Sequence, residues 1–132
     1  MDTNNKKKVL VIDDDGNLRN VLLDALTSAG FESEGAADGE EGLRMAFETH
    51  PDVIMLDVMM PKMNGWQMLD KLRMDDWGMN ARVIMLTSLG QMENIAEAVD
   101  KKVLTYIVKS DLDLKDIAST IQSAINSQLV KP

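Results

Sequence analysis

The chain has 132 residues, which suits one domain with a single core, and its 45% hydrophobic and 27% charged residues are ordinary for a globular protein. It has no cysteine, which excludes disulfides and thiolate metal sites, and its net charge of −8 argues against direct nucleic-acid binding, which needs lysine and arginine to neutralise phosphates. No apolar run is long enough to span a membrane and no signal-peptide pattern opens the chain, so we expect a cytoplasmic protein without a membrane partner.

Short apolar runs alternate along the chain with longer amphipathic segments. Four runs of strand length are apolar at both odd and even positions: residues 9–12, 53–56, 83–86 and 104–108. This pattern is typical of parallel strands that are covered on both faces. Residues 31–36 instead alternate and carry two glutamates, which favours a half-exposed strand at the edge of the sheet.

The segments between these strands have the spacing and start signals of helices. Asp38 with Glu41 resembles a capping box that opens a helix to about His50, and Asn64-Gly65 opens a shorter helix to about Met74. Three further helices are indicated by core-facing stripes, namely Leu18, Val21, Leu22, Ala25 and Leu26, then Met92, Ile95, Ala96 and Val99, and finally Leu114, Ile117, Ala118, Ile121 and Ile125.

The alternation of five strands with five helices predicts the fold. It indicates right-handed crossovers and an α/β, flavodoxin-like doubly wound (βα)5 domain, with five parallel strands in the order 2-1-3-4-5. In such a sheet, ligands bind beyond the carboxyl ends of the strands, where the strand order reverses between strands 1 and 3. We expect one domain over residues 1–132, with a core of about 8–128 and no output domain.

Polar residues follow the predicted central strands at this edge of the sheet. The first strand ends in Asp13 and Asp14, the third in Asp57, the fourth in Thr87 and the fifth in Lys109. An aspartate after a strand is often only a helix cap, but three carboxylates at one edge repel each other strongly. A divalent cation relieves that repulsion, and ligands with oxygen alone favour Mg²⁺ or Mn²⁺. The set therefore indicates Mg²⁺-assisted phosphoryl transfer onto a carboxylate.

Four segments, "VLVIDDD", "PDVIMLDVMMPKMNG", "VIMLTS" and "YIVKS", resemble the receiver domain of two-component response regulators in order and spacing over nearly the whole chain. The resemblance implies that Asp57 is the phosphoacceptor and takes its phosphoryl group from a phosphohistidine of a sensor histidine kinase or phosphotransfer protein. It implies that Asp14 binds Mg²⁺ directly, that Asp13 assists through water, and that the backbone carbonyl of Met59 is a further ligand.

The resemblance also implies roles around the phosphoryl group. Lys109 would pair with one phosphoryl oxygen and Thr87 would donate a hydrogen bond to another, with the small residue Ser88 beside it. Tyr106 matches an aromatic switch position, whose ring turns inward as Thr87 moves toward the phosphate. The alternative is that Tyr106 simply packs against the fourth helix.

The resulting hypothesis is a phosphorylation-activated signalling switch that changes its affinity for a downstream protein through the face of helix 4, strand 5 and helix 5. We expect a phosphoacceptor that assists its own phosphorylation, not a turnover enzyme. A phosphohydrolase of the haloacid dehalogenase type would need an acid where Met59 stands. The alternative function is a constitutive, phosphorylation-independent binding module. The sequence leaves open which kinase and which output are involved, and whether phosphorylation drives dimerisation.

One departure from the family pattern, and two positions that in receivers tend to modulate hydrolysis of the phosphoaspartate, carry expectations of their own. Lys109-Ser110 replaces the usual Lys-Pro, and because a cis bond before a residue other than proline costs about 2.5–4 kcal/mol, we expect a trans bond. Met59 and Leu89 stand two residues beyond Asp57 and Thr87. Neither can orient a water molecule, so we expect slow self-dephosphorylation.

Overall fold

The computed structural model describes residues 5–88 and 102–127, and its centre is a five-stranded parallel sheet in the order β2-β1-β3-β4-β5. The strands are β1 (Lys8–Ile12), β2 (Glu32–Ala36), β3 (Val53–Asp57), β4 (Val83–Thr87) and β5 (Thr105–Val108). The helices are α1 (Gly16–Ser28), α2 (Gly39–Thr49), α3 (Gly65–Arg73) and α5 (Ile117–Asn126). The predicted fold class and strand order are therefore confirmed.

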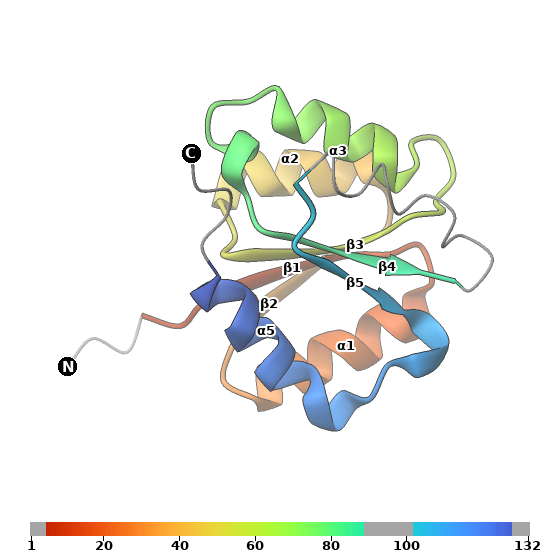
Figure 1. Ribbon diagram of the computed structural model, residues 1–132. Helices are drawn as coiled ribbons and strands as arrows, with labels where there is room; N and C mark the ends of the chain where they lie inside the picture. Colours follow the sequence, from red (N-terminus) through yellow and green to blue (C-terminus); the bar gives the residue numbers. More distant parts are fainter. Residues whose placement is uncertain (1–4, 89–101, 128–132) are drawn as a thin grey trace.

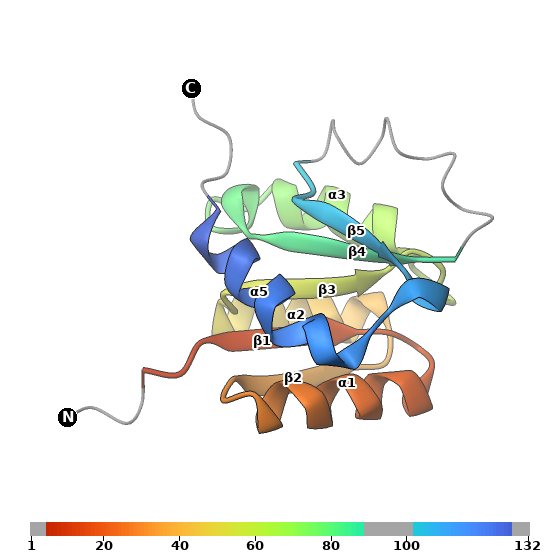
Figure 2. The same cartoon turned by 60° about the horizontal axis from the view of Figure 1, so that its bottom comes forward.

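Helices cover both faces of the sheet, with α2 and α3 on one side and α1 and α5 on the other (Figures 1 and 2). Each face has its own hydrophobic cluster, because successive side chains of a strand point to opposite faces. In β3, for example, Ile54 and Leu56 pack toward α2 and α3, whereas Val53 and Met55 pack toward α1 and α5. This two-sided burial is the reason that the central strands are apolar at every position.

Side-chain caps mark the starts of α1, α2 and α3. The Asp15 carboxylate accepts hydrogen bonds from the first amides of α1, and the Asp38 carboxylate accepts one from the Glu41 amide at the start of α2. Asn64 and Gln67 form a reciprocal capping box at the start of α3. The predicted starts at Asp38 and Asn64 are confirmed, and both helices end within a residue of the predicted ends.

Two predicted core positions and the predicted burial of one strand are corrected by the structure. Val21 is 43% exposed, because it lies at the border of a stripe centred on the buried residues Leu22 and Leu26. Leu114 is 41% exposed, because it belongs to a separate 3-10 turn and α5 begins only at Ile117. Strand β5 is only partly buried, since it is an edge strand. The helix predicted from the stripe at residues 92–99 lies outside the described residues.

Candidate functional site

The pairing of the strands sets how far each functional residue extends along the carboxyl edge of the sheet. Asp13 follows β1 at the level of Asp57, and Asp57 is paired with Leu86. Thr87 therefore lies one residue further along the edge than Asp57. Because Thr87 is level with the last residue of β5, Lys109 follows one position further still. The structure brings the predicted residues to one edge, in a staggered arrangement.

Three carboxylates gather at this edge. Oxygens of Asp13, Asp14 and Asp57 lie within 4.8 Å of one another. Asp13 and Asp57 are buried, at 0% and 2% exposure, whereas Asp14 is exposed to solvent. The sequence-predicted acidic cluster is thus present, with two carboxylates inside the protein and a third at its surface.

The ammonium group of Lys109 bridges the two buried carboxylates. Its Nζ lies 3.1 Å from Asp13 Oδ2 and 3.1 Å from Asp57 Oδ1. Burial alone would lower the pKa of Lys109, but its hydrogen bonds to both carboxylates raise that pKa overall. The described residues contain no cis peptide bond, so the expected trans bond between Lys109 and Ser110 is confirmed. The long lysine side chain reaches back over the stagger from the end of β5.

The pKa of Asp57 is raised even though the Lys109 ammonium lies beside it. Burial and the neighbouring Asp13 carboxylate raise the pKa of Asp57 from 3.8 to about 7, although Lys109 acts in the opposite direction. At neutral pH, a large fraction of Asp57 would hold a proton and could not act as a nucleophile. An additional cation at the cluster would favour the ionised carboxylate.

The donor set fits Mg²⁺. It consists of carboxylate oxygens, without histidine or cysteine, and Mg²⁺ prefers one or two carboxylates together with several waters. The exposure of Asp14 leaves the cluster open to solvent, so that waters and a phosphoryl oxygen can complete the coordination. The residues present could therefore hold the ion that the sequence implies.

Thr87 and Tyr106 lie on the neighbouring strands β4 and β5, on the same face of the sheet. Tyr106 is paired with Met85, and both pack in the cluster on the side of α2 and α3. Strand alternation places Thr87 on the same face as Met85. The Thr87 side chain is buried, and its hydroxyl donates a hydrogen bond of 3.1 Å to the Ser88 carbonyl.

Met59 lies in the loop after β3. Its backbone amide donates a hydrogen bond of 3.4 Å to Asp57 Oδ1, and its side chain is 59% exposed. The first turn of α3 lies so close to this loop that a Cβ on Gly65 would collide with the Asp57 carbonyl oxygen. A glycine at this point lets the Asp57 loop and α3 pack together.

Sequence reasoning missed Arg19, which the structure places against the site. Its Nη1 donates a hydrogen bond of 2.6 Å to the backbone carbonyl of Asp13. A usable signal was present, because Arg19 is the basic residue nearest to Asp13–Asp15 and follows Asp15 by one helical turn.

These observations define a class: a doubly wound parallel α/β domain with an acidic, magnesium-type site at its topological switch point. The model of the response regulator receiver domain matches residues 9–126, and the chain therefore belongs to this family. The domain is accordingly part of two-component, phosphorylation-dependent signalling. Within the described ranges, no helix has the length and apolar character needed to cross a bilayer.

Individual relatives agree with this assignment. The chain is 36% identical over 121 residues to the "Probable transcriptional regulator ycf27" of Cyanophora paradoxa, covering 92% of this chain and 49% of that protein. It is 35% identical over 104 residues to the chemotaxis protein CheY of Thermotoga maritima, covering 78% and 85%. The solved structure of chemotaxis protein CheY4 from Vibrio cholerae matches with a TM-score of 0.83 and 32% identity, over 90% of this chain and 98% of that one. The chain spans about half the length of the ycf27 relatives.

Proposed function

We propose that Asp57 accepts a phosphoryl group from a phosphohistidine of a sensor histidine kinase or phosphotransfer protein, in a reaction that depends on Mg²⁺. The observation that carries this proposal is the Lys109 ammonium, which lies 3.1 Å from both Asp13 and Asp57, beside the third carboxylate of Asp14. A buried carboxylate with a fixed ammonium and a cation-binding cluster has the parts that phosphoryl transfer needs, namely a nucleophile and positive charge.

In the proposed reaction, a carboxylate oxygen of Asp57 attacks phosphorus while the phosphorus–nitrogen bond to the donor histidine breaks. The electron pair of that bond remains on the imidazole nitrogen. Lys109 holds its charge beside the attacking oxygen and afterwards pairs with a phosphoryl oxygen. Asp13, Asp14, Asp57 and the carbonyl of Met59 would hold the ion, which neutralises charge on the phosphoryl oxygens when bound. Mn²⁺ has the same preference for oxygen ligands and is the second candidate.

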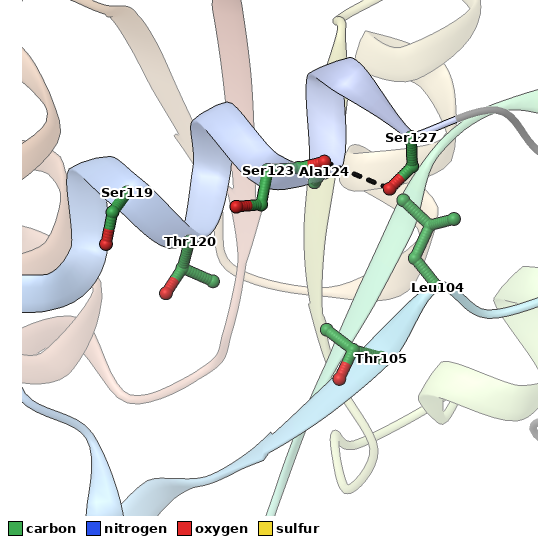
Figure 3. A pocket seen from close by; sticks show the side chains of 7 residues that line it. All are labelled: Leu104, Thr105, Ser119, Thr120, Ser123, Ala124 and Ser127. Atoms are coloured by element: carbon green, nitrogen blue, oxygen red, sulfur yellow. Dashed lines mark hydrogen bonds between the residues drawn. The ribbon is translucent and has the colours of Figure 1, made fainter.

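The response to phosphorylation is proposed to begin at Thr87. Its hydroxyl would leave the Ser88 carbonyl and donate to a phosphoryl oxygen, and the Tyr106 ring on the same face would then turn inward. The change would reach partners through the face of helix 4, strand 5 and helix 5. In the described part of that face, a groove of about 330 Å³ lies between the start of β5 and α5 (Figure 3).

The lining of this groove indicates what kind of contact it could make. The groove is lined by Leu104, Thr105, Ser119, Thr120, Ser123, Ala124 and Ser127. None of these side chains is charged, and the five serine and threonine residues carry hydroxyl groups. The Ser127 hydroxyl already donates to the Ser123 carbonyl. The groove is therefore suited to hydrogen bonding with a downstream protein more than to charge pairing.

The phosphorylated form is proposed to be long-lived. The exposed side chain two residues beyond Asp57 is Met59, which has no group to orient an attacking water. The matching position beyond Thr87, Leu89, lies outside the described residues. A half-life of a few seconds for the purified phosphoprotein would contradict this part of the proposal.

The test is incubation with acetyl phosphate and Mg²⁺, followed by the mass of the intact protein. We expect the gain of one phosphoryl group, no gain in Asp57→Asn or after chelation, and a normal gain in Asp24→Asn, which alters an exposed carboxylate on α1. No gain in the unaltered protein would favour the alternative, a binding module that acts without phosphorylation.

A further inference from the structure

Arg19 connects the two ends of the turn that carries the acidic residues. Its side-chain Nη1 donates a hydrogen bond of 2.6 Å to the Asp13 carbonyl, and its backbone amide donates one of 2.9 Å to the Asp15 carbonyl. The Asp13 carbonyl belongs to the peptide unit whose nitrogen is that of Asp14. Because a peptide unit is planar, holding this oxygen also fixes the start of Asp14.

The course of the Arg19 side chain is itself determined by packing against β2. A Cβ on Gly35 would lie 3.0 Å from Arg19 Cδ and 3.2 Å from its Cγ, so the missing side chain of Gly35 leaves the space that the arginine stem occupies. Gly35 is paired with Val11 of β1, two residues before Asp13. The guanidinium group is therefore presented to the turn from a fixed direction.

The other bonds of the turn hold Asp13 more directly than Asp14. The Asp13 amide donates to the Ala36 carbonyl at 3.1 Å, and Asp13 Oδ1 accepts from the Asp15 amide at 2.9 Å. The Asp14 side chain is exposed to solvent, whereas Asp13 is fully buried. The Arg19 bond to the Asp13–Asp14 peptide unit thus restrains the part of the turn where restraint is otherwise weakest.

We infer that Arg19 is a positioning residue for the magnesium site: its hydrogen bond to the Asp13 carbonyl orients the peptide unit that presents Asp14 to the cluster. The inference rests on the proposed magnesium site. This positioning role predicts a change in Mg²⁺ affinity that is opposite in sign to the change expected from charge alone. A guanidinium bonded to the backbone of the acidic turn repels Mg²⁺, so its removal would tighten Mg²⁺ binding if charge alone mattered, whereas loss of positioning weakens it.

The test measures the dissociation constant of Mg²⁺ by calorimetry, without any phosphoryl donor. Arg19→Met keeps a stem of similar length over Gly35 and removes the guanidinium, and we expect it to weaken Mg²⁺ binding about tenfold, the lower end of the effect of residues that orient metal ligands. Arg19→Lys keeps a donor and should recover most of this loss. The control Arg44→Met removes the same charge from an exposed ion pair on α2 and should leave the constant unchanged.

A second variant, in β2, tests the packing of the Arg19 stem against Gly35. Gly35→Ala should shift the arginine stem, together with Leu23 Cδ1, which would lie equally close at 3.0 Å. We expect it to weaken Mg²⁺ binding by less than Arg19→Met does, and its effect should not add to that of Arg19→Met. The unfolding free energy of each variant is measured in parallel, because a merely structural role would lower stability without changing the Mg²⁺ constant of the folded protein.

The outcomes separate this inference from the proposed function. If the unaltered protein binds Mg²⁺ and Arg19→Met binds it equally or more tightly, the positioning role is overturned and the magnesium site stands. If the unaltered protein does not bind Mg²⁺, both are overturned. If Mg²⁺ binding behaves as expected but acetyl phosphate leaves Asp57 unmodified, the positioning role stands and the proposed phosphoacceptor function fails.

Discussion

Strands β3 and β4 begin with the same four residues, Val-Ile-Met-Leu, and lie side by side in the sheet. Both are buried along their whole length. Their pairing is offset by one residue, however, so that Ile54 is opposite Val83 and not opposite Ile84. As a result, Ile54 packs toward α2 and α3 while Ile84 packs toward α1 and α5. The repeated sequence predicts that both strands are buried on both faces. It does not determine the face of the sheet to which each side chain points.

The offset also separates the two residues that end these strands. Asp57 is level with Asp13 and shares the Lys109 ammonium with it, whereas Thr87 stands one residue further along the edge. The Asp57 carboxylate therefore lies beside the charged groups of Asp13 and Lys109. The Thr87 hydroxyl lies further along the edge, on the face that contains Tyr106. A one-residue stagger between two strands with the same apolar sequence can thus place their end residues in different chemical surroundings.

The largest effect is expected from exchanging the two end residues. In the double variant Asp57→Thr and Thr87→Asp, the rate of phosphoryl incorporation from acetyl phosphate should fall by at least about a thousandfold, or roughly 4 kcal/mol of barrier. The new carboxylate would stand one residue beyond Asp13, away from the position that Lys109 bridges. Intact mass against time measures the rate, and circular dichroism checks that the variant folds. Incorporation within about tenfold of the unaltered protein would show that the stagger is unimportant.

The pH dependence of stability should differ between the ends of β3 and β4. The folded protein holds a proton on Asp57 up to a pKa of about 7, against 3.8 for an ordinary aspartate, so it binds more protons than the unfolded chain within this window. The stability that Asp57 contributes is complete below pH 3.8 and is lost as the pH rises toward 7, by up to about 1.4 kcal/mol per pH unit.

Urea denaturation without divalent cations, from pH 5 to 8, measures this difference. Asp57→Asn has no proton to lose there and should gain stability relative to the unaltered protein as the pH rises. Thr87→Ala should keep the pH slope of the unaltered protein. Parallel curves for Asp57→Asn and the unaltered protein would contradict the assigned pKa.

Removal of the Thr87 hydroxyl should separate phosphorylation from its response. We expect Thr87→Ala to accept phosphoryl groups within about tenfold of the normal rate, since one hydrogen bond contributes on the order of 1 kcal/mol. Its Tyr106 ring signals in NMR spectra should no longer shift on phosphorylation, whereas Thr87→Ser should restore the shift. A normal Tyr106 shift in Thr87→Ala would show that the hydroxyl does not transmit the change.

The smallest effect is expected from shortening the isoleucines that the two strands share. Ile54→Val and Ile84→Val should each cost about 0.5–1.5 kcal/mol of unfolding free energy, because both side chains are fully buried. Since they pack on opposite faces, their costs should add within about 0.5 kcal/mol. Ile54→Val and Val83→Ala alter directly paired side chains on one face and should show a larger coupling. Urea denaturation measures all of these, and strong coupling between Ile54 and Ile84 would contradict the separation of the two clusters.

Much of the fold was predictable because the central strands are covered on both sides, which gives continuous apolar runs that none of the four described helices contains. The caps at Asp38 and Asn64 were readable for a similar reason, since a helix start needs a side-chain acceptor within a few residues. The exposure of Val21 was not predictable from spacing, because the border of a helical stripe depends on how the helix sits on the sheet. The roles at the fourth helix and at Leu89 stay predictions.

The sequence by itself determined the types of group that meet at the carboxyl edge: carboxylates after β1 and β3, a hydroxyl after β4 and an amine after β5. These follow from local position, since each stands where a buried strand ends. Only the tertiary structure decided the one-residue stagger of β3 and β4, the 3.1 Å contacts of Lys109 and the bond from Arg19 to the Asp13 carbonyl. The stagger depends on how the helices pack across both faces of the sheet, and no short stretch of sequence contains that information.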